Sequence, residues 1–182
     1  MTAFISAGHN PKGIKVDPGA VANGLREADL TVEFRNLVVA ELLKRKVKVI
    51  TDKDDERLGD YLKRIKTGSG SVVLEFHFDA ALSPTATGTT SLYGNDADRL
   101  DIAFSKELAE ATSKILKIKN RGALSESQSH RGSLGLMRKE GIVSLLEVCF
   151  ISNPSDIKAY NENKKELAVK IAEIVEHYEN LI

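Results

Sequence analysis

The sequence predicts a mixed α/β fold, with a mostly parallel twisted sheet of about five to six strands and helices on both faces. Two observations predict this fold. Short apolar runs of strand length alternate along the chain with segments in which apolar residues recur every three or four positions. Strands that alternate with helices of ten or more residues indicate βαβ units, which build parallel sheets. The chain has 182 residues, the length of one ordinary domain, so we expect a single domain over residues 1–182.

Three strands and two helices are expected in the first part of the chain. The strands are the apolar runs at residues 4–7, 47–51 and 71–77. The helices are residues 27–46 and 58–66. Leu30, Phe34 and Val38 share one face of the first helix, and Leu58 and Leu62 share one face of the second. Each helix therefore has an apolar stripe to pack against a sheet.

Two more strands and two more helices are expected in the second part. The strands are residues 88–93, which we interpret as an edge strand, and Ile142–Phe150. The helices are residues 97–118 and 163–181. Only Ser144 and Glu147 interrupt the apolar run of the last strand, which is typical of a strand buried on both faces. Residues 153–156, Asn-Pro-Ser-Asp, have the composition of a turn that leads into a helix start.

Charge and hydropathy argue against several classes of partner. The chain has 26 Lys and Arg residues against 26 Asp and Glu, so its formal charge is zero and we expect no nucleic-acid partner. No run approaches the ~18 apolar residues of a membrane span, so we expect no membrane partner. The first residues lack the basic and apolar regions of a signal peptide, which predicts a protein made in the cytoplasm without one. Without long apolar heptads, the expected state is a monomer.

Three predicted strands carry a side chain capable of metal or acid–base chemistry at or near their carboxyl ends. These are His9, His77 and Glu147, and Glu27 stands where the loop from residue 17 enters the first helix. In parallel sheets, sites lie beyond the carboxyl ends of the strands. Two imidazoles and one carboxylate form a standard catalytic zinc set with an open fourth position. A second carboxylate beside them can act as general base.

Each of the three ligand candidates also has a purely structural interpretation. His9 could be a surface residue or a helix cap in the loop after the first strand. His77 stands between Phe76 and Phe78, as a buried and hydrogen-bonded core histidine would. Glu27 could simply place negative charge at the N-terminus of a helix, where the macrodipole favours it.

Glu147 gives a stronger functional signal because it interrupts a predicted core strand. A buried carboxylate is costly unless it is paired, hydrogen-bonded or used. The structural alternative for Glu147 is a buried ion pair. Cys149, the one cysteine of the chain, is expected on the same strand face as Glu147, as a small core residue rather than a nucleophile.

The order and context of these four residues resemble the zinc-dependent N-acetylmuramoyl-L-alanine amidases, the peptidoglycan-cleaving family of bacterial autolysins and phage endolysins. The matching segments are residues 6–9 (SAGH), 17–20 (DPGA), 23–29 (NGLREAD), 75–80 (EFHFDA) and 145–153 (LLEVCFISN). Weaker matches lie at residues 120–123 and 135–138. Together the matches reach from the first predicted strand almost to the last predicted helix.

The resemblance implies a catalytic domain that hydrolyses the amide between N-acetylmuramic acid and L-alanine of the peptidoglycan stem peptide. It implies that His9, Glu27 and His77 bind Zn2+ and that Glu147 is catalytic. We expect a substrate groove rimmed by residues 88–93 and 125–134. Two features depart from the family: Asn10-Pro11-Lys12-Gly13 in place of small glycine-rich residues, and Asp79 where asparagine is common.

Two alternative functions remain beside this interpretation. One is another zinc amidohydrolase, a carboxypeptidase or a deacetylase, and the other is a non-catalytic cell-wall-binding module. We expect no separate wall-anchoring domain, because no repeated or basic module is present. A protein of this kind would act on the cell wall after release, either as a phage endolysin or as a bacterial lytic enzyme.

Overall fold

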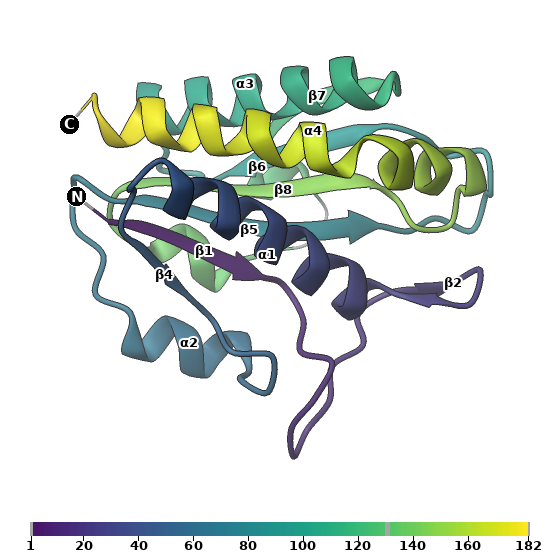
Figure 1. The fold of residues 1–182 in the computed structure, drawn as a ribbon, viewed down its shortest axis with the longest axis horizontal. Helices are drawn as coiled ribbons and strands as arrows, with labels where there is room; N and C mark the ends of the chain where they lie inside the picture. Colours follow the sequence, from purple (N-terminus) through teal and green to yellow (C-terminus); the bar gives the residue numbers. More distant parts are fainter. Residues whose placement is uncertain (1, 130–131, 182) are drawn as a thin grey trace.

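A computed structural model describes residues 2–129 and 132–181 of the chain. In that part, six strands form one sheet in the order β4-β1-β5-β8-β6-β7 (Figure 1). The strands are β1 (Ala3–Ala7), β4 (Val49–Thr51), β5 (Val72–Asp79), β6 (Thr89–Tyr93), β7 (Asn120–Ser125) and β8 (Ile142–Phe150). β4, β1, β5 and β8 pair in parallel, β6 runs antiparallel to β8, and β7 runs parallel to β6. The predicted mostly parallel sheet with helices beside it is confirmed.

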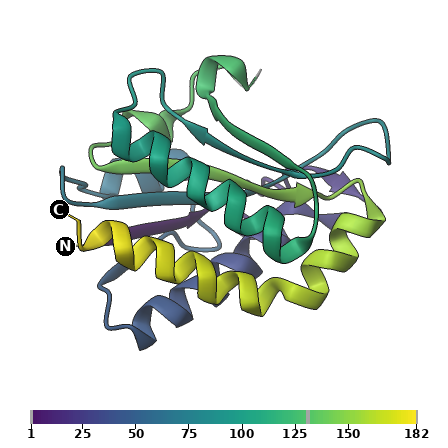
Figure 2. The same cartoon turned by 90° about the horizontal axis from the view of Figure 1, so that it is seen from above.

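Three long helices cover one face of the sheet, and shorter helices cover the other. The helices are α1 (Glu27–Lys44), α2 (Leu58–Arg64), α3 (Arg99–Leu116), α4 (Pro154–Glu179) and the single turns η1 (Glu126–Gln128) and η2 (Gly135–Arg138). α4 lies along α3 in both ribbon views and also contacts α1 (Figures 1 and 2). α2 and η2 pack on the opposite face, so apolar side chains flank the sheet on both sides.

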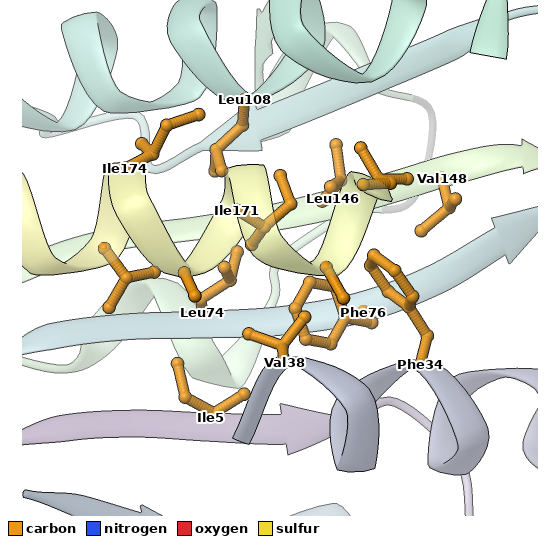
Figure 3. Close-up of a cluster of buried hydrophobic side chains, with 14 of the residues drawn as sticks. Ile5, Phe34, Val38, Leu74, Phe76, Leu108, Leu146, Val148, Ile171 and Ile174 are labelled. Carbon is orange, nitrogen blue, oxygen red and sulfur yellow. The ribbon is translucent and has the colours of Figure 1, made fainter. Parts of the chain in front are cut away.

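The larger core lies between the sheet and the three long helices (Figure 3). Phe34 and Val38 of α1 meet Leu74 and Phe76 of β5 there, and Ile171 of α4 packs over them. β5 and β8 lie in the middle of the sheet, and every residue of β8 is buried. This burial explains why both strands have nearly continuous apolar sequences.

Two sheet features differ from the sequence prediction. Residues 88–93 do not form an edge strand, because β7 pairs with β6 on its outer side. β7 was not predicted because its sequence, Asn-Arg-Gly-Ala-Leu-Ser, has no apolar run and its glycine adopts a φ of 87°. Two residues of β7 are exposed and the other four are only partly buried, so this edge strand leaves only a weak hydropathy signal.

The last helix begins nine residues before the predicted start, at Pro154 instead of 163. The side chain of Asn153 accepts hydrogen bonds from the backbone N–H groups of Ser155 and Asp156, and proline occupies the first turn. The cap therefore starts the helix, although its first turns are too polar to show an apolar stripe. The described residues contain no helix with the length and apolarity needed to cross a bilayer.

An irregularity in the pairing of β5 and β8 corrects the placement of Cys149. His77 lies opposite Glu147, but Asp79 lies opposite Phe150, so β8 has one residue more than β5 over this stretch. The extra residue ends the strict alternation of faces. Cys149 consequently packs with Val148 in the larger core, away from the face that carries Glu147. It is fully buried, as expected of a small core residue.

Candidate metal centre

Glu27 is the first residue of α1, and the surrounding backbone holds its side chain at the edge of the sheet. The short hairpin of β2 (Val21–Ala22) and β3 (Leu25–Arg26) leads directly into the helix. One carboxylate oxygen of Glu27 accepts a hydrogen bond from the N–H of Phe78 at 3.0 Å, and the other accepts one from the N–H of Ala20 at 2.8 Å. Backbone donors on both oxygens favour the ionised carboxylate, although the side chain is only 3% exposed.

Both predicted histidines place a ring nitrogen against this carboxylate. Nδ1 of His77 lies 2.8 Å from one oxygen of Glu27, and Nε2 of His9 lies 3.2 Å from the other. The two rings stand edge to face, with centroids 4.9 Å apart. One ligand atom from each of the three residues lies within 4.8 Å of the others. The structure therefore brings together the three residues that the sequence singled out as metal ligands.

The carboxylates of this cluster favour positive charge on the two imidazoles. Burial raises the pKa of Glu27, but the hydrogen bonds of His77 and His9 lower it well below its ordinary range. Burial lowers the pKa of His77, but the neighbouring carboxylates of Glu27 and Glu75 raise it to about 10. Two nitrogen donors and one oxygen donor with this charge distribution match the donor set of a catalytic zinc ion.

Two glycines lie so close to the cluster that a side chain on either would overlap a candidate ligand. A Cβ atom on Gly8 would lie 2.1 Å from the ring of His77. A Cβ atom on Gly19, whose φ is 63°, would lie 2.6 Å from both Glu27 Oε2 and His9 Cδ2. Neither position can carry a side chain without moving a candidate ligand. This requirement accounts for glycine in the segments before His9 and before Glu27.

The loop after His9 closes on itself through Asn10. Its side-chain amide donates to the carbonyl oxygens of Lys12 and Lys15, both at 2.9 Å. Asn10 also pairs with Asp17 as an isolated antiparallel bridge. The closed loop returns the chain so that a carboxylate oxygen of Asp17 lies 3.0 Å from Nδ1 of His9. The departure from a glycine-rich segment thus has a structural role in this chain.

Glu75 is part of the site, and sequence reasoning assigned it no role. It lies two residues before His77 on the same face of β5, with a carboxylate oxygen 3.1 Å from Nε2 of His77. Its other oxygen accepts a hydrogen bond from the hydroxyl of Ser6 at 3.2 Å. A signal was present, because Glu75 interrupts an apolar strand just as Glu147 does. Period-two alternation also places it on the face of His77.

Glu147 lies opposite His77 on the neighbouring strand β8 and is 3% exposed. It lines a hollow of about 340 Å³, and its pairing with His77 connects this hollow to the three-residue cluster. The residues around this hollow are Asp79, Thr90, Leu92, Arg121, Leu124, Gln128, Ser129 and Glu147. Both predicted rims contribute, through Thr90 and Leu92 on one side and Gln128 and Ser129 on the other. Residues 130–131 of the second rim lie outside the described residues.

Asp79 lies at the hollow and not in the cluster of imidazoles. It is the last residue of β5, and its side chain accepts a hydrogen bond from the N–H of Ala80 at 2.8 Å. Across the hollow, the guanidinium carbon of Arg121 stands 5.2 Å from the ring centroid of Phe150. The hollow therefore has acidic groups at the end of β5 and in β8, and a basic group on β7.

Comparisons with known proteins agree with this geometry. The model of the N-acetylmuramoyl-L-alanine amidase family matches residues 4–177. A putative amidase of this kind from Neisseria meningitidis is 30% identical with a TM-score of 0.77, and the match covers 97% of this chain and 94% of that one. An amidase from Clostridium difficile 630 is 22% identical with a TM-score of 0.80, covering 98% and 96%. A search of curated proteins finds no match.

The catalytic domain of an endolysin is among the similar structures. The catalytic domain of the CD27L endolysin, which targets Clostridia difficile, is 17% identical with a TM-score of 0.75. The match covers 97% of each of the two chains. At this identity the likeness establishes a shared fold.

Proposed function

This chain belongs to the N-acetylmuramoyl-L-alanine amidase family, and we propose that His9, Glu27, His77 and Glu147 together carry out its reaction. The enzyme is a peptidoglycan hydrolase, which cleaves the amide between N-acetylmuramic acid and L-alanine of the stem peptide. The proposal concerns the metal, its ligands and the general base.

His9, Glu27 and His77 would hold one zinc ion. The inward-facing nitrogens of the two imidazoles and the carboxylate of Glu27 converge within 4.8 Å, and three protein ligands leave one position open. Bound zinc supplies a Lewis acid that polarises the scissile carbonyl and makes water acidic enough to lose a proton near neutral pH. Because Glu27 is held as a carboxylate by two backbone donors, it can serve as a ligand without first losing a proton.

Glu147 would act as the general base and then as the general acid. Its carboxylate lines the hollow beside the cluster, where a substrate amide can lie between the metal ligands and β8. Glu147 takes a proton from the attacking water and delivers it to the departing amine of L-alanine. The hollow has walls on four strands, so it can hold the amide while the glycan and the peptide extend from it.

The observation that carries this proposal is the convergence of His9, Glu27 and His77 on one point, next to a hollow that contains Glu147. The test is hydrolysis of purified peptidoglycan by the intact protein before and after a strong chelator. We expect release of new L-alanine amino groups, loss of this activity with the chelator, and recovery with added zinc.

Product analysis separates the alternative functions in the same experiment. A deacetylase would release acetate, and a carboxypeptidase would release a terminal amino acid from the stem peptide. A wall-binding module would bind the wall without releasing any product. Full activity in protein shown to be free of metal would contradict the proposed zinc centre.

A further inference from the structure

Each imidazole of the cluster has a carboxylate on the nitrogen that faces away from Glu27. Behind His77, Nε2 lies 3.1 Å from Glu75 Oε1. Resting on the proposed metal centre, we propose that Glu75 is a positioning residue. It holds His77 with its proton on Nε2, so that Nδ1 keeps the lone pair that binds the metal.

A metal binds an imidazole ring that has lost one proton and is neutral. One of its nitrogens carries the proton and the other offers a lone pair, and a metal takes only the second. Nδ1 of His77 is the nitrogen that faces Glu27, at 2.8 Å. The carboxylate of Glu75 accepts hydrogen bonds, so when a metal replaces the proton between Nδ1 and Glu27, Glu75 favours the form of the ring with the proton on Nε2. That form is the one competent for metal binding.

Glu75 is itself held in place by the neighbouring strand. Ser6 of β1 lies directly opposite Glu75 in the parallel pairing, and its hydroxyl donates to Glu75 Oε2 at 3.2 Å. Ser6, Glu75 and His77 thus form a chain of hydrogen bonds across two central strands. All three are buried, with exposures of 1%, 1% and 5%. Water therefore has little room to replace the carboxylate if it is removed.

The buried setting also argues against a merely structural role. A carboxylate in the interior is costly, and an apolar side chain would fill the same place in the sheet at lower cost. Its retention beside a ligand is explained if it orients the ring and makes Nδ1 more basic toward the metal. Carboxylates that support metal-binding histidines in this way typically contribute 10–100-fold in metal affinity.

Asp17 provides the control, because its carboxylate lies against the other imidazole of the cluster. Its carboxylate lies 3.0 Å from Nδ1 of His9, but its side chain is 57% exposed. Water can take its place, so Asp17→Asn is expected to weaken zinc binding by at most about fivefold. Glu75→Gln preserves volume and removes the charge, and it is expected to weaken zinc binding by about 10–100-fold.

The experiment measures the zinc dissociation constants of the wild type, Glu75→Gln and Asp17→Asn by chelator competition, with the unfolding temperature of each metal-free protein. A large loss of affinity in Glu75→Gln alone, at a nearly unchanged unfolding temperature, supports the positioning role. Equal affinities for all three proteins would overturn it. A lower unfolding temperature with wild-type affinity would make Glu75 structural.

A second measurement needs no variant and covers the case in which Glu75→Gln does not fold. In cadmium-loaded, nitrogen-labelled wild type, we expect scalar coupling between the metal and Nδ1 of His77, with a proton retained on Nε2. Coupling to Nε2 would overturn the role of Glu75 while leaving the metal centre intact. Failure of the wild type to bind either metal would remove the proposed function itself, and with it this inference.

Discussion

The two halves of the candidate metal centre each pair an imidazole with a carboxylate, but in different surroundings. His9 lies in the loop after β1, backed by Asp17 in a second loop that is open to solvent. His77 lies within β5, backed by Glu75 and, behind it, by Ser6 of the adjacent strand. Both rings turn their other nitrogen toward Glu27. One imidazole is therefore held by a loop and the other by the sheet.

The difference shows how burial determines what a supporting carboxylate contributes. Two unit charges ~4 Å apart attract by only about 1 kcal/mol in bulk water, and by several times more at the dielectric of a protein interior. Behind His9, water can replace Asp17 at little cost. Behind His77, water has little access, so removing Glu75 leaves Nε2 of His77 without a replacement acceptor. We therefore expect substitutions on the sheet side to have larger effects than the same substitutions on the loop side.

The largest expected difference is in the stability of two variants of the candidate ligands, His77→Ala and His9→Ala. Both should lose zinc and activity. His77→Ala also leaves Glu27 and Glu75 facing a buried space, and should lower the free energy of unfolding of the metal-free protein by about 3–5 kcal/mol. His9→Ala leaves Glu27 with His77 and two backbone donors, and should cost only about 1 kcal/mol. Denaturant unfolding measures both losses. Equal losses in the free energy of unfolding would contradict the expected difference between the two sides of the site.

Glu147 belongs to the sheet side, where it pairs in register with His77. Glu147→Gln keeps the volume and removes the capacity to accept a proton, so the rate of wall hydrolysis should fall by roughly 10²–10⁴. Zinc content should remain near that of the wild type, because Glu147 is not a ligand in this scheme. Rate, zinc content and melting temperature are measured on the same sample.

Asp79→Asn is the control for Glu147, since Asp79 lines the same hollow outside the metal cluster. It should lower the rate by less than about tenfold, below the usual contribution of a positioned acid–base group. If Glu147→Gln melts much earlier but keeps its activity per folded molecule, Glu147 has a structural role instead.

A smaller effect is expected from Gly8→Ala, which adds one methyl group against the ring of His77. The Cβ atom would lie 2.1 Å from the ring, so the ring or β1 must shift, at a cost of about 1–3 kcal/mol in unfolding free energy and with weaker zinc binding. Gly59→Ala in α2 is the control, because its Cβ atom meets nothing within 4 Å. It should stabilise the protein by up to about 1 kcal/mol. Similar melting temperatures for the two variants would show that the approach of Gly8 to His77 is not tight.

The central strands could be predicted from the sequence because burial on both faces leaves a clear pattern, and the ends of these strands indicated which side chains converge. β8 was predicted with its observed bounds, and the carboxyl ends of β1 and β5 directed attention to His9 and His77. Glu27 was found at the start of its helix, where a loop enters the site. At these strand ends and at this helix start, the local sequence pattern is enough to predict where the side chain lies in the fold.

Other features depend on contacts that no local pattern records. β7 is polar and joins the sheet through its pairing with β6. The placement of Cys149 depends on an irregularity in the pairing of β5 and β8, which alternation along one strand does not reveal. The role of Glu75 became visible only when Ser6 and His77 were placed on either side of it. The sequence does mark Glu75 as a carboxylate within an apolar strand, like Glu147, but it does not show the contacts with Ser6 and His77.

The most direct test of the central claim is a crystal structure of the zinc-loaded protein with anomalous data collected at the zinc edge. We predict one strong anomalous peak per chain, at a zinc ion bound by Nε2 of His9, the carboxylate of Glu27 and Nδ1 of His77. Glu75 should remain within hydrogen-bond distance of Nε2 of His77. A peak elsewhere, or none at saturating zinc in an active crystal, would contradict the assignment of these three residues as the metal centre.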